Sequence, residues 1–115
     1  MPSVLRVCIR LDTMRPMNTI HRTDGFDAWL SGLKDHKAKA RILVRIRAAE
    51  RGNFGDCKPV GDTVSELRID VGPGYRVYFT RTGTVVYLLL CGGNKSTQSR
   101  DIARAKDMAR RLRED

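Results

Sequence analysis

Apolar and polar residues alternate most regularly between residues 64 and 95, where the pattern predicts three short strands. In the first two strands every second residue is apolar, the period of a strand with one buried and one open face. The third, Val85 to Leu90, is apolar without alternation and predicts a central strand covered on both faces. A turn at Thr82 and Gly83 precedes it, with the glycine supplying a positive φ. The apolar series are Leu67, Ile69 and Val71 in the first strand and Tyr75, Val77 and Phe79 in the second.

A helical period predicts three helices around these strands. Thr23 or Asp24 can cap the first, the second runs from about His36 to Arg51, and Ser96 or Thr97 can cap the last. The first two are joined by a short connection and form a helical hairpin. The apolar stripes are Phe26, Trp29, Leu30 and Leu33 in the first helix, Ala38, Ile42, Ile46 and Ala49 in the second, and Ile102, Ala105, Ala109 and Leu112, with Met108 beside them, in the third.

The order of these elements indicates an α+β domain. A short strand at Thr19 to Arg22 opens it, and a glycine-rich loop from Gly52 to Asp62 separates the helical hairpin from the three strands. We therefore predict a helical hairpin and a C-terminal helix packed on a small, mostly antiparallel sheet. The chain of 115 residues has the size of one domain, which we place in residues 17–115.

Residues 1–16 allow two interpretations. Met17 begins a sensible domain start, which would make the preceding residues an upstream extension that is not native to the domain. In the second interpretation these residues form an extra strand, since apolar and polar residues alternate in part of the segment. The alternating residues are Val7, Ile9 and Leu11 against Cys8, Arg10 and Asp12.

The formal net charge of +9 and the pI near 10.1 point to a polyanionic partner. Nucleic acid fits first, an acidic protein second and an anionic membrane surface third. No apolar run approaches the roughly 20 residues of a membrane span. Three cysteines far apart in the sequence exclude a disulfide framework and fit a reducing cytoplasm. No spacing typical of a metal site or a nucleotide-binding loop is present, so we expect no metal and no cofactor.

The polar face of the first two predicted strands carries the candidate chemistry. If these strands are neighbours, Glu66, Arg68, Arg76 and Tyr78 share that face, and Lys95 leaves the third strand nearby. Arginine forks onto phosphate oxygens, lysine adds a point charge, and an aromatic ring can stack on a base. The same composition also fits an ordinary solvated sheet face.

A longer set of motifs carries a family resemblance. They are Phe26-Asp27-x-Trp29-Leu30-x-x-Leu33-Lys34-Asp35, Arg51-Gly52-Asn53-x-Gly55-Asp56, Glu66-Leu67-Arg68-Ile69, Gly72-Pro73-Gly74-Tyr75-Arg76-Val77-Tyr78-Phe79 and Gly92-Gly93-x-Lys95-x-Thr97-Gln98-x-x-Asp101-Ile102. With them, the chain from about Met17 onward resembles the RelE/ParE superfamily of bacterial toxins, in the HigB-like branch of addiction module killer proteins. The resemblance implies a RelE-like fold and a ribosome-dependent mRNA endonuclease of the cytoplasm. Its implied partners are mRNA, the ribosome and a cognate antitoxin, which we expect to be a helix-turn-helix protein.

Matched position by position, the resemblance also implies roles. Arg76 matches the arginine that RelE-type toxins use on the scissile phosphate, and Lys95 matches a basic residue at the end of the last strand. Arg68 and Glu66 fall where those toxins have catalytic lysines, and Asp101 falls where RelE has a catalytic tyrosine. The departures at Glu66 and Asp101 mean that the acid–base work is reassigned, that the activity is weak, or that the target differs.

Metal-independent RNA cleavage needs a base for the 2′-hydroxyl, cations for the phosphorane and an acid for the leaving oxygen. We expect Arg68, Arg76 and Lys95 to supply the positive charge. In one hypothesis Glu66 is the base or orients Arg68, and Lys95 or Tyr78 assists the leaving group; in the other Glu66 only neutralises Arg68. The residues expected to contact RNA are Arg68, Arg76, Lys95, Lys58, Arg100 and Arg104.

From the sequence we predict the first of three functions and keep the other two as alternatives. The first is an mRNA-cleaving toxin of a type II toxin–antitoxin system that inhibits translation. The second is a ParE-like inhibitor that binds DNA gyrase, and the third is a basic nucleic-acid-binding subunit without catalysis.

Overall fold

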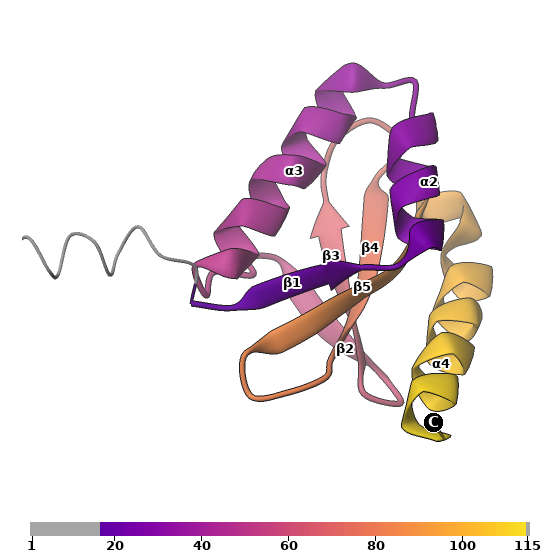
Figure 1. Cartoon of the computed structure of the whole chain (residues 1–115). Coiled ribbons are helices and arrows are strands. Elements are labelled where there is room, and N and C mark those ends of the chain that lie inside the picture. The colour runs from indigo at the N-terminus through magenta and orange to yellow at the C-terminus, as the bar shows by residue number, and fades with distance from the viewer. Residues whose placement is uncertain (1–16, 115) are drawn as a thin grey trace, which may run out of the picture.

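A five-stranded mixed sheet with helices on both faces makes up the described part of the chain (Figure 1). The structure is a computed structural model that describes residues 17–114, so both interpretations of residues 1–16 lie outside it. The predicted α+β fold, with its helical hairpin, C-terminal helix and mostly antiparallel sheet, is confirmed. The elements are β1 (Thr19–Arg22), α2 (Asp24–Gly32), α3 (His36–Glu50), β2 (Cys57–Gly61), β3 (Val64–Ile69), β4 (Tyr75–Arg81), β5 (Val86–Asn94), the 3-10 turn η1 (Lys95–Thr97) and α4 (Gln98–Glu114).

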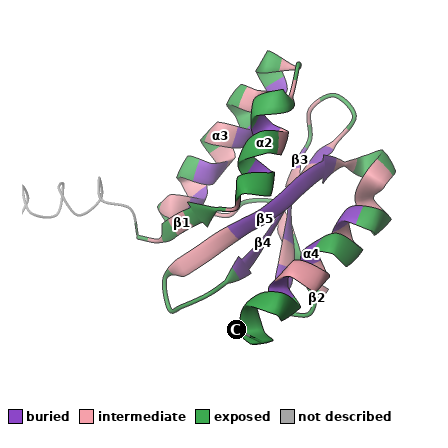
Figure 2. Cartoon of the chain, turned by 45° about the vertical axis from the view of Figure 1, so that its right-hand side comes forward, coloured by how far each residue is buried: buried purple, intermediate pink, exposed green. Residues whose placement is uncertain are grey.

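The strand order is β1-β5-β4-β3-β2. β1 runs parallel to β5, and every other neighbouring pair is antiparallel. Figure 2 shows β4 and β5, which contain many buried residues, between α2 and α3 on one side and α4 on the other. Both sheet faces are therefore covered along these strands.

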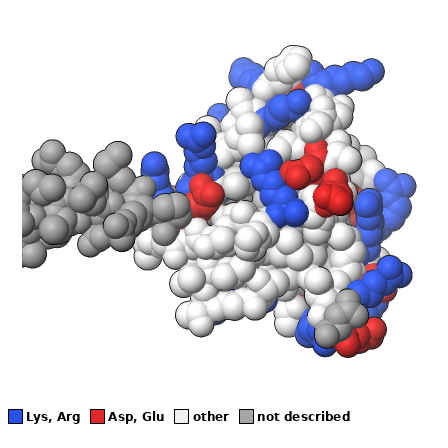
Figure 3. All heavy atoms as spheres, in the orientation of Figure 1, with Lys and Arg blue, Asp and Glu red and all other residues white. Residues whose placement is uncertain are grey.

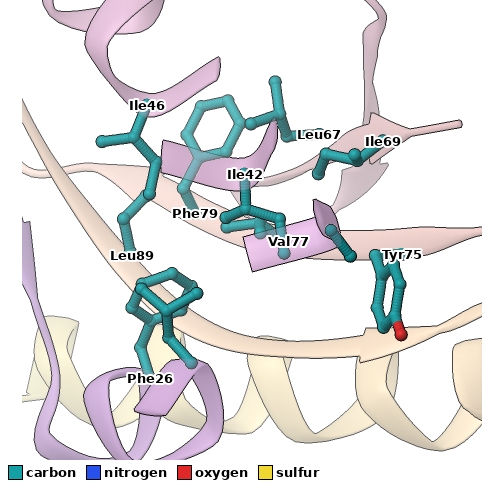
Figure 4. Packing of buried hydrophobic residues seen from close by; sticks show 11 residues of the cluster. Phe26, Ile42, Ile46, Leu67, Ile69, Tyr75, Val77, Phe79 and Leu89 are labelled. Atoms are coloured by element: carbon teal, nitrogen blue, oxygen red, sulfur yellow. The ribbon is translucent and has the colours of Figure 1, made fainter. Parts of the chain in front are cut away.

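The larger core lies between the sheet and the helical hairpin (Figure 4). Thr23 caps α2 by accepting a hydrogen bond from the Phe26 amide at 3.0 Å, and its hydroxyl also donates to the Leu90 carbonyl at 2.7 Å. The same side chain thus starts the helix and ties it to β5. The buried members of this core are Phe26, Leu30, Ala38, Ile42, Ile46, Leu67, Ile69, Tyr75, Val77, Phe79 and Leu89.

A second, smaller core lies beneath α4. Tyr78 pairs with Cys91 and Phe79 with Leu89, so Leu90 is an extra residue in β5 and forms a bulge. Both Leu90 and Cys91 pack in this core, which a regular alternation would not allow. Leu112 was predicted to belong to the inner stripe of α4 but is 45% exposed, because the helix continues past its last buried residue, Ala109. The buried members are Val64, Tyr78, Leu90, Cys91, Ala105 and Ala109.

Two local predictions were wrong. The predicted loop from Gly52 to Asp62 contains the edge strand β2, whose pattern is interrupted by Pro59 and glycines. Proline is tolerated on an edge strand because one side of that strand needs no ladder hydrogen bond. Gly83 does not have a positive φ. The amides of Thr82 and Gly83 both donate to the Val86 carbonyl, which closes a loop longer than a two-residue turn.

Two consecutive glycines let α2 and α4 approach β5 from opposite faces. A Cβ atom at Gly92 would overlap the indole of Trp29, and one at Gly93 would overlap the carboxylate of Asp101. Trp29 belongs to α2 and Asp101 to α4. The end of β5 is therefore a point of close packing between three elements.

We predict that Gly92→Ala lowers the free energy of unfolding by about 1–3 kcal/mol, because the partly buried indole of Trp29 has to move from its place against the core. Gly32→Ala is the matched control, since a Cβ there meets nothing within 4 Å. The control should be neutral or up to about 1 kcal/mol more stable. Urea denaturation measures both; equal stability of the two variants would contradict the packing at Gly92.

Candidate functional site

The sheet register brings the predicted site residues of β3 and β4 together. Glu66 lies opposite Tyr78 and Arg68 lies opposite Arg76, so all four project to the face that carries α4. The Lys95 amide donates to the Gly74 carbonyl at 2.8 Å. A Cβ position at Gly74 lies 3.5 Å from Nη1 of Arg76 and 3.6 Å from Cβ of Lys95. Arg76 and Lys95 therefore border the same glycine.

The prediction that this face is open was wrong for the half of it that carries Glu66 and Tyr78. Glu66 and Tyr78 are 0% exposed, because α4 lies over them. The tyrosine ring is therefore not available to stack on a base. The Arg76 side chain lies at the edge of the covered region and is 11% exposed.

Glu66 is the centre of a buried polar network. Its Oε2 accepts a hydrogen bond from the Tyr78 hydroxyl at 3.0 Å and another from Nε2 of Gln98 at 2.6 Å. Nε of Arg76 lies 3.7 Å from the same oxygen, an ion-pair distance longer than a hydrogen bond. Oε1 of Glu66 has no hydrogen-bond partner among residues 17–114. The carboxylate is thus held by β4 and by the first residue of α4.

Arg68 has a different carboxylate partner from the one expected. Its Nη2 lies 3.0 Å from Oδ1 of Asp56, in the segment before β2, whereas the cation beside Glu66 is Arg76. Arg45 of α3 holds this region by donating to the carbonyls of Arg68 at 2.6 Å and Phe54 at 2.9 Å. The hypotheses in which Glu66 orients or neutralises Arg68 therefore do not match the observed pairing.

Burial determines the protonation of two groups under α4. It raises the pKa of Tyr78 far above its ordinary value, and the hydrogen bond to Glu66 and the Glu66 charge act in the same direction. Burial likewise raises the pKa of Cys91 from 9.0 to about 11. Tyr78 is consequently a neutral hydrogen-bond donor to Glu66 near neutral pH, rather than a source of protons for a reaction.

The remaining candidates are distributed around this network. Asp101 is buried against Gly93 and accepts a hydrogen bond from the Thr97 hydroxyl, which indicates a structural contact. Lys58 is exposed and lies opposite Glu66 on β2. Arg100 is exposed and, with Lys95, lines an open depression at the start of α4. Arg104 points toward Gly25 of α2 and so lies apart from the Arg68–Arg76 pair.

Gln98 is the network member to which the sequence assigned no role. It belongs to one of the family motifs, but an amide side chain after a predicted cap gives no local sign that it reaches a carboxylate 32 residues away. The amphipathic pattern of the final helix was the available signal, because its apolar stripe required a sheet face to cover.

Positive charge is spread over the surface rather than confined to the site. On the face shown in Figure 3, Lys and Arg side chains stand on several parts of the molecule, whereas Asp and Glu form fewer groups. Within residues 17–114, no group of three or more His, Cys, Asp or Glu side chains is placed to hold a metal ion. In the same range, no helix is both long and apolar enough to cross a membrane.

We predict that the protein loses stability as pH rises above 9.0, because the Cys91 thiol ionises in the unfolded chain but stays protonated in the folded one up to about pH 11. Tyr78 adds a second loss above about pH 10, the ordinary tyrosine pKa. Each group contributes a slope of about 1.4 kcal/mol per pH unit while only its unfolded form is ionised. Cys91→Ala should remove the first part of the slope and Tyr78→Phe the second in urea titrations; unchanged slopes in both variants would contradict the burial of these groups.

Comparison with known proteins identifies the family of this chain. Residues 28–114 match the family model described as Phage derived protein Gp49-like (DUF891). An uncharacterized protein of Haemophilus influenzae is 54% identical over 93 residues, which cover 81% of this chain and 94% of that relative. The matched residues include all of α3, β2 to β5 and α4. The chain therefore belongs to the phage-derived Gp49-like family.

Proposed function

We propose that the chain is the toxin of a type II toxin–antitoxin pair and cleaves ribosome-bound mRNA without a metal ion. The motif resemblance to RelE/ParE toxins of the HigB-like branch supports this proposal, as do the α+β fold, membership of a phage-derived family and the net charge of +9. The proposed partners are mRNA, the ribosome and a cognate helix-turn-helix antitoxin, all in the cytoplasm.

One observation carries the proposal, namely the gathering of cations at one end of the sheet. Arg76 lies opposite Arg68 across β4 and β3, and it shares the border of Gly74 with Lys95. Two guanidinium groups and an ammonium that come from separate segments can surround one phosphate. Because β3 and β4 fix the backbone positions of Arg68 and Arg76, these two charges need little reorganisation when charge develops on the phosphate.

In the proposed reaction the 2′-hydroxyl of the RNA loses its proton to solvent water, its oxygen attacks the adjacent phosphorus, and the bond from phosphorus to the 5′-oxygen breaks. The products are a 2′,3′-cyclic phosphate and a 5′-hydroxyl end. Arg76 and Arg68 stabilise the negative charge of the phosphorane, and Lys95 donates a proton to the departing 5′-oxygen. Glu66 and Tyr78 are both buried beneath α4. We therefore assign no direct contact with RNA to either residue.

We predict that Arg76→Ala removes most of the activity, at least about 100-fold, because a forked phosphate contact that strengthens in the transition state is lost. Arg81→Ala is the matched control, because Arg81 is an exposed arginine at the opposite end of the same strand. Its substitution removes the same charge. Growth after induction of each variant without antitoxin gives the first measurement. Growth arrest by Arg76→Ala at the wild-type level would place the active centre elsewhere.

A second experiment separates the proposed reaction from the gyrase-binding and non-catalytic functions. After induction we expect messages cut within translated regions, carrying cyclic phosphate ends, with unchanged DNA supercoiling. Sequencing of RNA ends and plasmid gel electrophoresis measure the two effects in the same culture. Intact messages with altered supercoiling and an SOS response would support gyrase inhibition instead, and normal growth would support a subunit without catalysis.

A further inference from the structure

We infer that Glu66 and Gln98 are positioning residues that aim Arg76 at the phosphate. This inference rests on the proposed function, because it assigns to two covered side chains a part in the site that Arg76 forms. Neither residue touches the RNA in this account. Both act through the guanidinium.

The burial of Glu66 is the first argument. The residue is 0% exposed, and one of its two oxygens has no hydrogen-bond partner within residues 17–114. A buried carboxylate that is incompletely hydrogen-bonded is costly, and apolar side chains of similar volume often replace buried ion pairs without loss of stability. Holding α4 on the sheet would therefore not require a charge here, whereas fixing a cation does.

The arrangement around Oε2 is the second argument. Tyr78 and Gln98 donate to this oxygen from β4 and from the first residue of α4, which fixes the carboxylate from two elements. Nε of Arg76 lies 3.7 Å from the same oxygen and has no hydrogen-bond partner in the described chain. The carboxylate thus faces the Nε side of the guanidinium.

The direction of Arg76 completes the argument. Its Nη1 lies on the side of Gly74, where Lys95 also begins its side chain. Nη1 also donates to the Tyr75 carbonyl at 3.4 Å, so pairing Nε with the carboxylate leaves Nη2 and the second hydrogen of Nη1 for phosphate oxygens. A displacement of about 1 Å at such a group can cost on the order of 100-fold in rate, so an aligning carboxylate has a functional consequence.

Gln98 connects α4 to the site. Gln98 is the first residue of the helix, and it reaches Glu66 only while the helix is seated on the sheet. Removing its amide should therefore loosen Arg76 without removing any charge from the surface.

The test uses Glu66→Gln and Gln98→Leu in the full chain. The first variant keeps an acceptor for Tyr78 and Gln98 but loses the charge beside Arg76; the second keeps side-chain volume but loses the donor. Ser99→Ala is a control at the neighbouring exposed position. Ile102→Val is a second control that weakens the packing of the same helix without touching the network.

The first measurement is the nitrogen–proton NMR resonance of Arg76 Nε, identified by its absence in Arg76→Lys. We expect this resonance to shift in Glu66→Gln and Gln98→Leu and to stay unchanged in both controls, because only the former two disturb the carboxylate that lies 3.7 Å from Nε. Unchanged resonances in Glu66→Gln and Gln98→Leu would overturn the inference, even if both variants were less stable.

The second measurement is the cleavage of ribosome-bound message, with kcat and KM determined separately. We expect kcat to fall roughly 10- to 100-fold in both variants, with KM changed by less than about three-fold, because misalignment affects the transition state most. A wild-type level of kcat in both variants would overturn the positioning role. If the wild-type protein cuts no RNA, the proposed function fails, and the Arg76 resonance alone then decides whether Glu66 and Gln98 hold the guanidinium.

Discussion

The structure depends on a carboxylate that is buried beside an arginine. Glu66 lies in β3, beneath α4; Arg76 balances its charge, and Tyr78 and Gln98 donate hydrogen bonds to it. An unpaired ion at this depth would be strongly destabilising, so α4, β3 and β4 have to pack in the observed way for the carboxylate to be tolerated. The same contacts determine where the guanidinium of Arg76 lies.

This constraint divides the basic surface into two kinds of cation. Arg76 is largely buried and anchored, and Arg68 is partly held by Asp56, whereas Lys95, Lys58 and Arg100 are exposed. Exposed cations attract a polyanion over a distance and bind it without a fixed geometry. Guanidinium groups held by a carboxylate have a fixed geometry, and the proposed function uses this difference to place phosphate recognition at one end of the sheet.

Local patterns predicted much of the fold, because a two-residue period determines which residues share a strand face. Glu66, Arg68, Arg76 and Tyr78 were placed on one face from this period, and the register agrees. The pattern could not show that α4 covers half of that face, since coverage depends on contacts between distant segments such as Gln98 and Glu66. The partner of Arg68 was also missed, because Asp56 lies in a loop whose sequence has no periodicity.

Replacing Arg76 by lysine offers the most direct test of the account, because it keeps the charge and removes the fork. The measurement is the dissociation constant of a 2′-O-methyl oligoribonucleotide, which can bind but not be cut. The account predicts binding at least about ten-fold weaker for Arg76→Lys than for the wild-type protein, with little change for Arg81→Lys. Equal binding by wild-type and Arg76→Lys proteins would contradict the central claim that an anchored guanidinium at this position grips the phosphate.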